Sequence, residues 1–165
     1  MKREQLKITK SGDRDLVMTR VFDAPRALVY DAHTKPELVR QWLGGLPGWT
    51  MPVCDMDVRV GGKYRWVWRN ETAGAEMGMG GVYREVKAPE RLVTTEKFDE
   101  AWYPGESLNT LVLSEKGGRT TLTQTMRYES AAAREAVIKS DMEEGVTGSY
   151  DRLEDLLAAT SRVGR

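Results

Sequence analysis

Alternating apolar and polar residues run through most of the first 128 positions of the chain. In segment 15–22, Val17, Thr19 and Val21 fall on one side of an extended backbone, and this alternation predicts a β-strand. Six further segments have strand-like patterns, at 52–58, 63–69, 77–86, 91–98, 108–113 and 120–128. Short turns rich in glycine, proline and charged residues separate them, and this spacing favours an antiparallel meander.

Two short helices are predicted directly after the first strand. Segment 23–33 begins with an aspartate and a proline, so Asp23 is a candidate N-cap of the first helix. Segment 36–42 opens on a proline and ends before two glycines, which indicates a second helix of about two turns.

The helical pattern returns after residue 130 and continues almost to the end of the chain. A short helix is predicted from Ser130, and Ser140 with Glu143 matches a capping box that would start another helix. From 142 to about 159 the apolar residues recur at intervals of four and three, which predicts one long amphipathic helix.

This order of elements predicts an α+β fold with one domain over residues 15–160, preceded by a polar lead-in at 1–14. A curved antiparallel sheet of about six to seven strands must bury one face. The long C-terminal helix is the only element large enough to cover that face, so we expect the sheet to wrap around it. The two short helices would close one end, and the space left between helix and sheet would form a pocket.

Composition excludes several functional classes. The chain has 165 residues with 25 basic and 25 acidic side chains, so it lacks the basic excess of a nucleic-acid-binding protein. Its single cysteine, Cys54, allows neither an intramolecular disulfide nor a zinc site built on paired cysteines, and no cofactor motif or metal site is indicated. Signal-peptide and membrane-span patterns are missing, so we expect a cytoplasmic protein.

Several ordered segments resemble the START-like, or SRPBCC, superfamily, and its branch of homologues of the heat-shock-protein-90 ATPase activator. They are VFDAPR at 21–26, VGGKYRW at 60–66, GVYREV at 81–86, PERLV at 89–93 and MEEG at 142–145. The resemblance implies a helix-grip fold with a hydrophobic cavity. It implies function less directly, because the superfamily includes lipid carriers, polyketide cyclases and co-chaperones. The eukaryotic activator engages the chaperone through a further N-terminal domain, for which we expect no counterpart in this chain.

The residues expected to line the cavity are mostly aromatic or sulfur-containing. Tyr64, Trp66 and Trp68 alternate along one strand and share a face, where they either line a pocket or fill the core. Methionines suit irregular ligands. Trp102 lies in a loop that would either close the pocket mouth or form a packed turn. The full predicted lining is Tyr64, Trp66, Trp68, Met79, Glu96, Phe98, Trp102, Met126, Met142 and Gly145.

Three residues leave alternatives open. Glu96 shares a strand face with Leu92 and Phe98; if that face is inward, its pKa rises and it is a candidate acid or base, and otherwise it is a surface charge. Gly145, in the long helix, costs about 1 kcal/mol relative to alanine, which suggests close packing or room for a ligand, with close packing favoured. His33 lies at the C-terminal end of a predicted helix, where a protonated imidazole would interact favourably with the helix dipole.

Three functions follow, in order of preference. The first is binding of a small apolar or amphipathic molecule in the cavity. The second is a cyclase-type or hydrolase-type enzyme that uses Glu96, which would need a polar partner such as Tyr64 or Arg65. The third is a co-chaperone-like interaction module, which predicts an exposed apolar patch instead of a deep cavity. A free sheet edge or exposed tryptophans leave a homodimer open.

Overall fold

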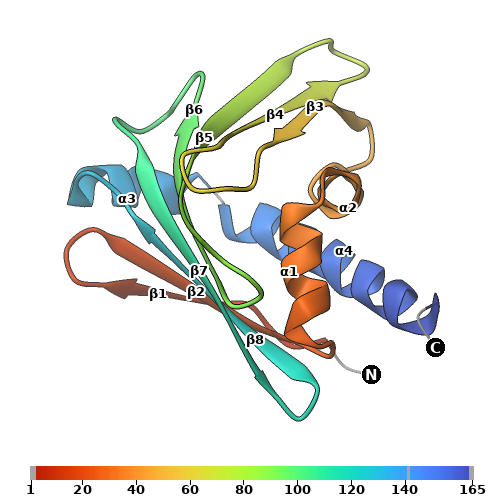
Figure 1. Ribbon diagram of the computed structural model, residues 1–165. Helices are drawn as coiled ribbons and strands as arrows, with labels where there is room; N and C mark the ends of the chain where they lie inside the picture. The colour runs from red at the N-terminus through yellow and green to blue at the C-terminus, as the bar shows by residue number, and fades with distance from the viewer. Residues whose placement is uncertain (1–2, 141, 164–165) are drawn as a thin grey trace.

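The fold is a single antiparallel sheet bent around a long helix. A computed structural model describes residues 3–140 and 142–163 (Figure 1). The eight strands lie in the order β1-β2-β8-β7-β6-β5-β4-β3. Their bounds are β1 Lys7–Ser11, β2 Asp15–Phe22, β3 Trp49–Met56, β4 Lys63–Asn70, β5 Glu76–Lys87, β6 Arg91–Phe98, β7 Ser107–Lys116 and β8 Arg119–Arg127.

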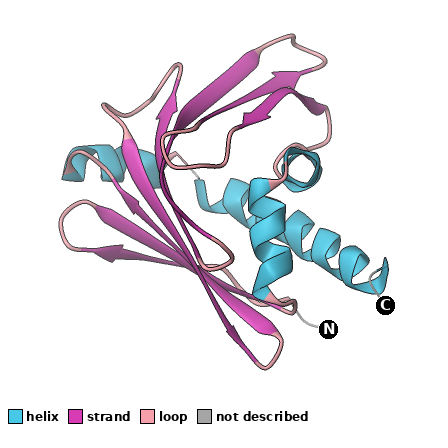
Figure 2. Cartoon of the chain, viewed as in Figure 1, coloured by secondary structure: helices cyan, strands magenta, loops and turns pink. Residues whose placement is uncertain are grey.

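The helices gather on one side of this sheet. They are α1 Arg26–Thr34, α2 Pro36–Trp42, α3 Ala131–Lys139 and α4 Met142–Val163. Figures 1 and 2 show α4 crossing the molecule with α1 and α2 beside it and α3 at the other end of the sheet. This is the predicted helix-grip arrangement, in which the sheet and α4 enclose the interior between them.

The main core forms where the second half of α4 meets the sheet. Tyr150, Leu153 and Leu157 are buried on one face of α4, at the three- and four-residue spacing of a helix. They pack against Phe22 of β2 and Leu122 of β8, among other residues of the same cluster. This contact anchors the C-terminal half of α4, so the space enclosed by the sheet lies beneath its N-terminal half.

The strand count is higher than the sequence pattern predicts, eight instead of six to seven. The additional strand is β1, which lies in the segment that was expected to be an unpaired lead-in. It pairs antiparallel with β2, with Lys7 opposite Thr19 and Ser11 opposite Asp15. Its side chains are mostly exposed, and only Ile8 packs against the core, so an edge strand here carries no hydrophobic alternation.

One predicted helix cap is wrong. The residue before α1 is Pro25, and the first free N–H of α1, at Arg26, donates 2.7 Å to the Glu115 carboxylate of β7, so Asp23 is not the cap. Ser140 ends α3, and its hydroxyl donates to the carbonyl of Val137. The capping box predicted at Ser140 and Glu143 includes position 141, which lies outside the described residues.

The cap of α3, in contrast, is local. Ser130 is extended and its hydroxyl accepts a 3.0 Å hydrogen bond from the N–H of Ala133. We expect Ser130→Ala to lower the free energy of unfolding by about 1 kcal/mol, because that N–H loses its acceptor. Ser130→Asp, which retains an acceptor, should stay within about 0.5 kcal/mol of the wild type in urea denaturation. Equal losses in both variants would rule out the capping role.

Candidate functional site

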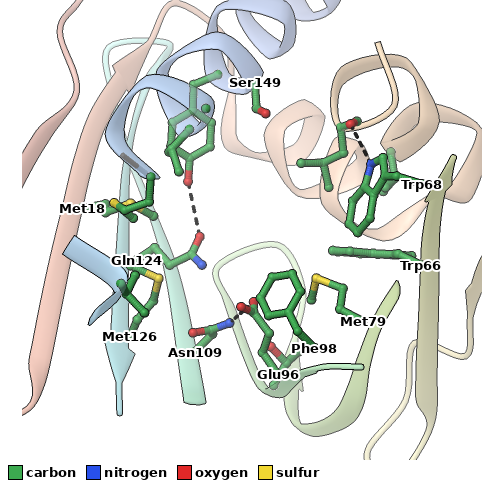
Figure 3. Close-up of a pocket in the computed structure, with 18 of the residues that line it drawn as sticks. Met18, Trp66, Trp68, Met79, Glu96, Phe98, Asn109, Gln124, Met126 and Ser149 are labelled. Atoms are coloured by element: carbon green, nitrogen blue, oxygen red, sulfur yellow. Dashed lines mark hydrogen bonds between the residues drawn. The ribbon is translucent and has the colours of Figure 1, made fainter. Parts of the chain in front are cut away.

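A cavity of about 1080 Å³ lies between the sheet and the N-terminal half of α4 (Figure 3). Its volume is at the upper end of the range for pockets that hold a drug-sized ligand. All ten residues that the sequence predicts for the lining do line it, and they come from β4, β5, β6, β8, α4 and the loop after β6. Their role in binding a ligand stays a prediction.

One wall of the cavity is aromatic. Tyr64, Trp66 and Trp68 of β4 point inward, while Arg65 between them points to solvent and pairs with Asp99 at 2.7 Å. The ring centroids of Tyr64 and Trp66 are 4.8 Å apart, and those of Trp66 and Trp68 are 6.2 Å apart. The predicted alternation along this strand is therefore correct, and it gives the cavity a continuous surface of π-faces.

The aromatic surface extends across neighbouring strands. In the sheet register Trp66 lies opposite Met79 of β5, and Met79 lies opposite Phe98 of β6. Beyond Phe98, the ring of Trp102 follows at a centroid distance of 4.7 Å. Because β-register sets these three positions side by side, a flat apolar ligand could lie along the row.

Several large apolar residues of the lining are exposed and mark the mouth of the cavity. The exposed fractions are 47% for Leu46, 43% for Met77 and 46% for Trp102. Trp102 thus lies at the mouth while its ring packs on Phe98, which combines the two alternatives considered for this loop. Apolar side chains at an opening into an apolar cavity favour entry of a ligand that is itself apolar.

The two glycines of α4 face this space. A β-carbon at Gly145 would meet no atom within 4 Å, and one at Gly148 would meet only the Arg152 guanidinium at 3.6 Å. Close packing, the favoured interpretation from sequence, is therefore wrong at Gly145. Both glycines line the cavity, and Gly145 is also exposed to solvent, so no neighbouring element fills the space at Gly145.

The polar centre of the cavity is Glu96 on β6. The face of β6 that carries Leu92, Thr94, Glu96 and Phe98 is inward, which resolves the alternative left open by the sequence. Protein surrounds the carboxyl group, although part of its own surface is reachable from the cavity. Burial raises the pKa of Glu96 to about 7, and a 2.7 Å hydrogen bond from Asn109 opposes that rise.

Two amide side chains of the cavity were missed by the sequence analysis. Asn109 of β7 donates to Glu96, and Gln124 of β8 accepts a 3.3 Å hydrogen bond from the Tyr150 hydroxyl (Figure 3). Asn109 shares its strand face with Leu111, and Gln124 shares its face with Leu122 and Met126. An amide on an otherwise apolar strand face was the signal that could have revealed both.

His33 also differs from its predicted state. It lines the cavity, its Nδ1 donates 2.7 Å to the Val29 carbonyl, and its ring lies 5.0 Å from that of Trp42. Burial lowers the pKa of His33 to about 4, so the ring is neutral at physiological pH and no protonated imidazole completes the helix dipole. Since Nδ1 carries the proton, Nε2 is an acceptor.

Other kinds of site find no support in the part of the chain that the structure describes. Within residues 3–140 and 142–163, no three histidine, cysteine or carboxylate side chains come together as metal ligands would. Cys54 is buried and packs as a small apolar residue, as predicted. No described helix has both the length and the hydrophobicity of a membrane span.

A sheet that grips a long helix over an apolar cavity defines the START-like class of proteins. Within that class, the chain belongs to the family described as Activator of Hsp90 ATPase homolog 1-like protein, whose model matches residues 23–158. The family resemblance seen in the sequence is thereby confirmed.

Solved structures support the same assignment. A Rhodobacter sphaeroides protein is 32% identical, with 93% of this chain and 98% of that chain covered and a TM-score of 0.87. A Chromobacterium violaceum protein is 27% identical over 88% of this chain and 98% of that one, with a TM-score of 0.76. An HSP90 activator from Plasmodium falciparum shares the fold at 21% identity, 69% and 72% coverage and a TM-score of 0.54. A search of curated proteins found no match.

Proposed function

We propose that the protein binds a small apolar or amphipathic molecule in the cavity between the sheet and α4. The observation that carries this proposal is the cavity of about 1080 Å³ with its aromatic wall and a polar centre at Glu96. Apolar contact would supply most of the affinity, and the few polar groups would orient the ligand. The exposed apolar residues at the mouth give such a ligand a path of entry.

The test uses N-phenyl-1-naphthylamine, an uncharged dye whose fluorescence rises in apolar surroundings. We expect saturable binding with one dye per chain. Gly145→Phe combined with Gly148→Phe should weaken binding at least about tenfold, because both rings would occupy open volume in the cavity. The readout is a fluorescence titration at constant protein concentration.

The matched control is Gly145→Ala combined with Gly148→Ala. A methyl group fits at both positions, so dye affinity should change less than about twofold. The free energy of unfolding should rise by up to about 1 kcal/mol per site, because alanine has a higher helix propensity than glycine. Unsaturable dye binding to the wild type, or equal affinity of the two double variants, would contradict the proposal.

Acid–base catalysis on the bound molecule is a second candidate, favoured by one observation: a carboxyl group with a pKa of about 7 inside the cavity. Neither of the two partners expected for Glu96 is available to it. Arg65 points to solvent, and the Tyr64 hydroxyl donates a 2.7 Å hydrogen bond to the Thr95 carbonyl. Once a ligand is identified, loss of its turnover in Glu96→Gln with retained binding would establish this function.

A co-chaperone role is the third candidate, and the family description supports it. It requires an apolar surface that a protein partner could cover. Leu46, Met77 and Trp102 are such residues, but they surround the mouth of the cavity, so ligand entry explains their exposure equally well. For this reason we place ligand binding first.

A further inference from the structure

The polar groups of the cavity offer more free acceptors than free donors. Asn109 is only 6% exposed, and its Oδ1, which has almost no accessible surface, has no hydrogen-bond partner among the described residues. Because an ionised carboxylate only accepts, Asn109 turns its NH₂ group to Glu96, and this leaves the amide oxygen free beside the carboxylate. His33 Nε2 is a further unpaired acceptor, and Trp66 Nε1 is an unpaired donor.

Glu96 lines the cavity, and its carboxylate only accepts hydrogen bonds when it is ionised. The ligand group that would complete it is therefore a hydrogen-bond donor. It also lies close to π-faces, since Phe98 and Tyr64 flank Glu96 within the same wall. Aromatic faces beside a carboxylate attract cations through the ring quadrupole.

The charges around Glu96 point in the same direction. The titratable groups that face it are the phenols of Tyr64 on β4, Tyr103 in the loop after β6, and Tyr128 after β8, and burial raises the pKa of each. The one arginine of the described lining, Arg152, is engaged elsewhere, donating to the Trp42 carbonyl at 2.8 Å and to the Ser149 hydroxyl at 3.2 Å. None of the groups that shift the pKa of Glu96 is a cation.

We infer that the ligand carries a protonated amine, which donates to the Glu96 carboxylate while its apolar body lies against Trp66 and Phe98. This inference rests on the proposed function and names the chemical class of the ligand. The amine would supply the positive charge that the protein itself does not place beside Glu96.

The experiment compares three probes with the same aromatic body, each titrated by calorimetry into the wild-type protein. They are 2-(1-naphthyl)ethylamine, 2-(1-naphthyl)ethanol and 1-naphthylacetic acid. We expect the amine to bind at least about tenfold more tightly than either of the others, since only the amine forms a charge-assisted hydrogen bond with Glu96. Glu96→Gln should abolish this preference, and Glu100→Gln, at an exposed glutamate in the turn after β6, should leave it unchanged.

The pH dependence gives a second readout with a defined sign. Amine binding requires ionised Glu96, whose pKa lies near 7, so the apparent dissociation constant should fall about tenfold between pH 6 and pH 8 while the amine stays protonated. Glu96→Gln should remove this dependence. The alcohol should show no such gain.

The outcomes separate this inference from the proposed function. Equal affinities for the three probes, tightest binding of the acid, or tighter amine binding at pH 6 would each overturn the amine inference, even where the uncharged dye binds in the cavity. If the dye does not bind, the result counts against the proposed function. If the calorimetric titration shows no binding of the amine, the amine inference is overturned.

Discussion

Asp151→Ala combined with Glu154→Ala is expected to lower the free energy of unfolding by about 3–5 kcal/mol, because it leaves a buried arginine without a counter-charge. That arginine is Arg20 on β2, which is 1% exposed. Its Nη1 lies 2.9 Å from Asp151 and its Nη2 lies 3.8 Å from Glu154, both on α4. Within residues 3–140 and 142–163, its Nε and Nη2 have no hydrogen-bond partner, so the two carboxylates are its main compensation.

The control variants identify the cause of the loss. Asp155→Ala removes a carboxylate from the same helix, but its side chain is 68% exposed and its partner is Arg3, so we expect a change below about 1 kcal/mol. Adding Arg20→Met to the double variant removes the uncompensated charge and should recover most of the loss. The measurement is urea denaturation followed by circular dichroism. A further loss on adding Arg20→Met would show that packing of Arg20, rather than its charge, dominates.

Glu96→Gln is expected to stabilise the protein at pH 8 by about 3 kcal/mol and to have little effect at pH 4. The pKa of Glu96 rises from 4.5 to about 7 on folding, and each unit of such a shift corresponds to about 1.4 kcal/mol. Because folding raises this pKa, the contribution of Glu96 to stability is fully present below pH 4.5, the pKa in the unfolded state. It is lost as the pH rises through about 7, the pKa in the folded state. Glutamine stays neutral, keeps an oxygen for Asn109, and so avoids that loss.

Denaturation curves at pH 4, 6 and 8 test this sign. The difference between Glu96→Gln and the wild type should grow across the interval from pH 4.5 to 7 and then remain constant. Glu100→Gln, at an exposed position in the turn after β6, should show no such growth. A Glu96→Gln variant that is equally stable, or less stable, at pH 8 would mean that folding does not desolvate this carboxyl group.

The wall of the cavity could be predicted from sequence because strand faces follow a period of two. Trp66 and Trp68 alternate with Arg65 and Arg69, and in the structure the tryptophans line the cavity while the arginines are exposed. The long helix was predictable for a similar reason: its apolar spacing repeats locally and requires no knowledge of the partner. Local periodicity also located β6 with both of its ends correct.

Features that depend on a distant partner were not predictable in this way. The cap of α1 comes from Glu115, 89 positions beyond Arg26, and β1 is a strand only because β2 pairs with it. The same holds for His33, whose neutral state follows from burial against Trp42 after the chain has folded. In each case the local residues are equally compatible with another structure.

The sequence by itself determined the order of the elements after β1, the inward aromatic face of β4 and the family to which the chain belongs. Tertiary structure decided the chemistry of the cavity. Glu96 and Asn109 lie on different strands, and their hydrogen bond depends on the register between β6 and β7. The pKa of Glu96 depends in turn on the protein that surrounds it, because desolvation is a property of the assembled fold and not of any single segment.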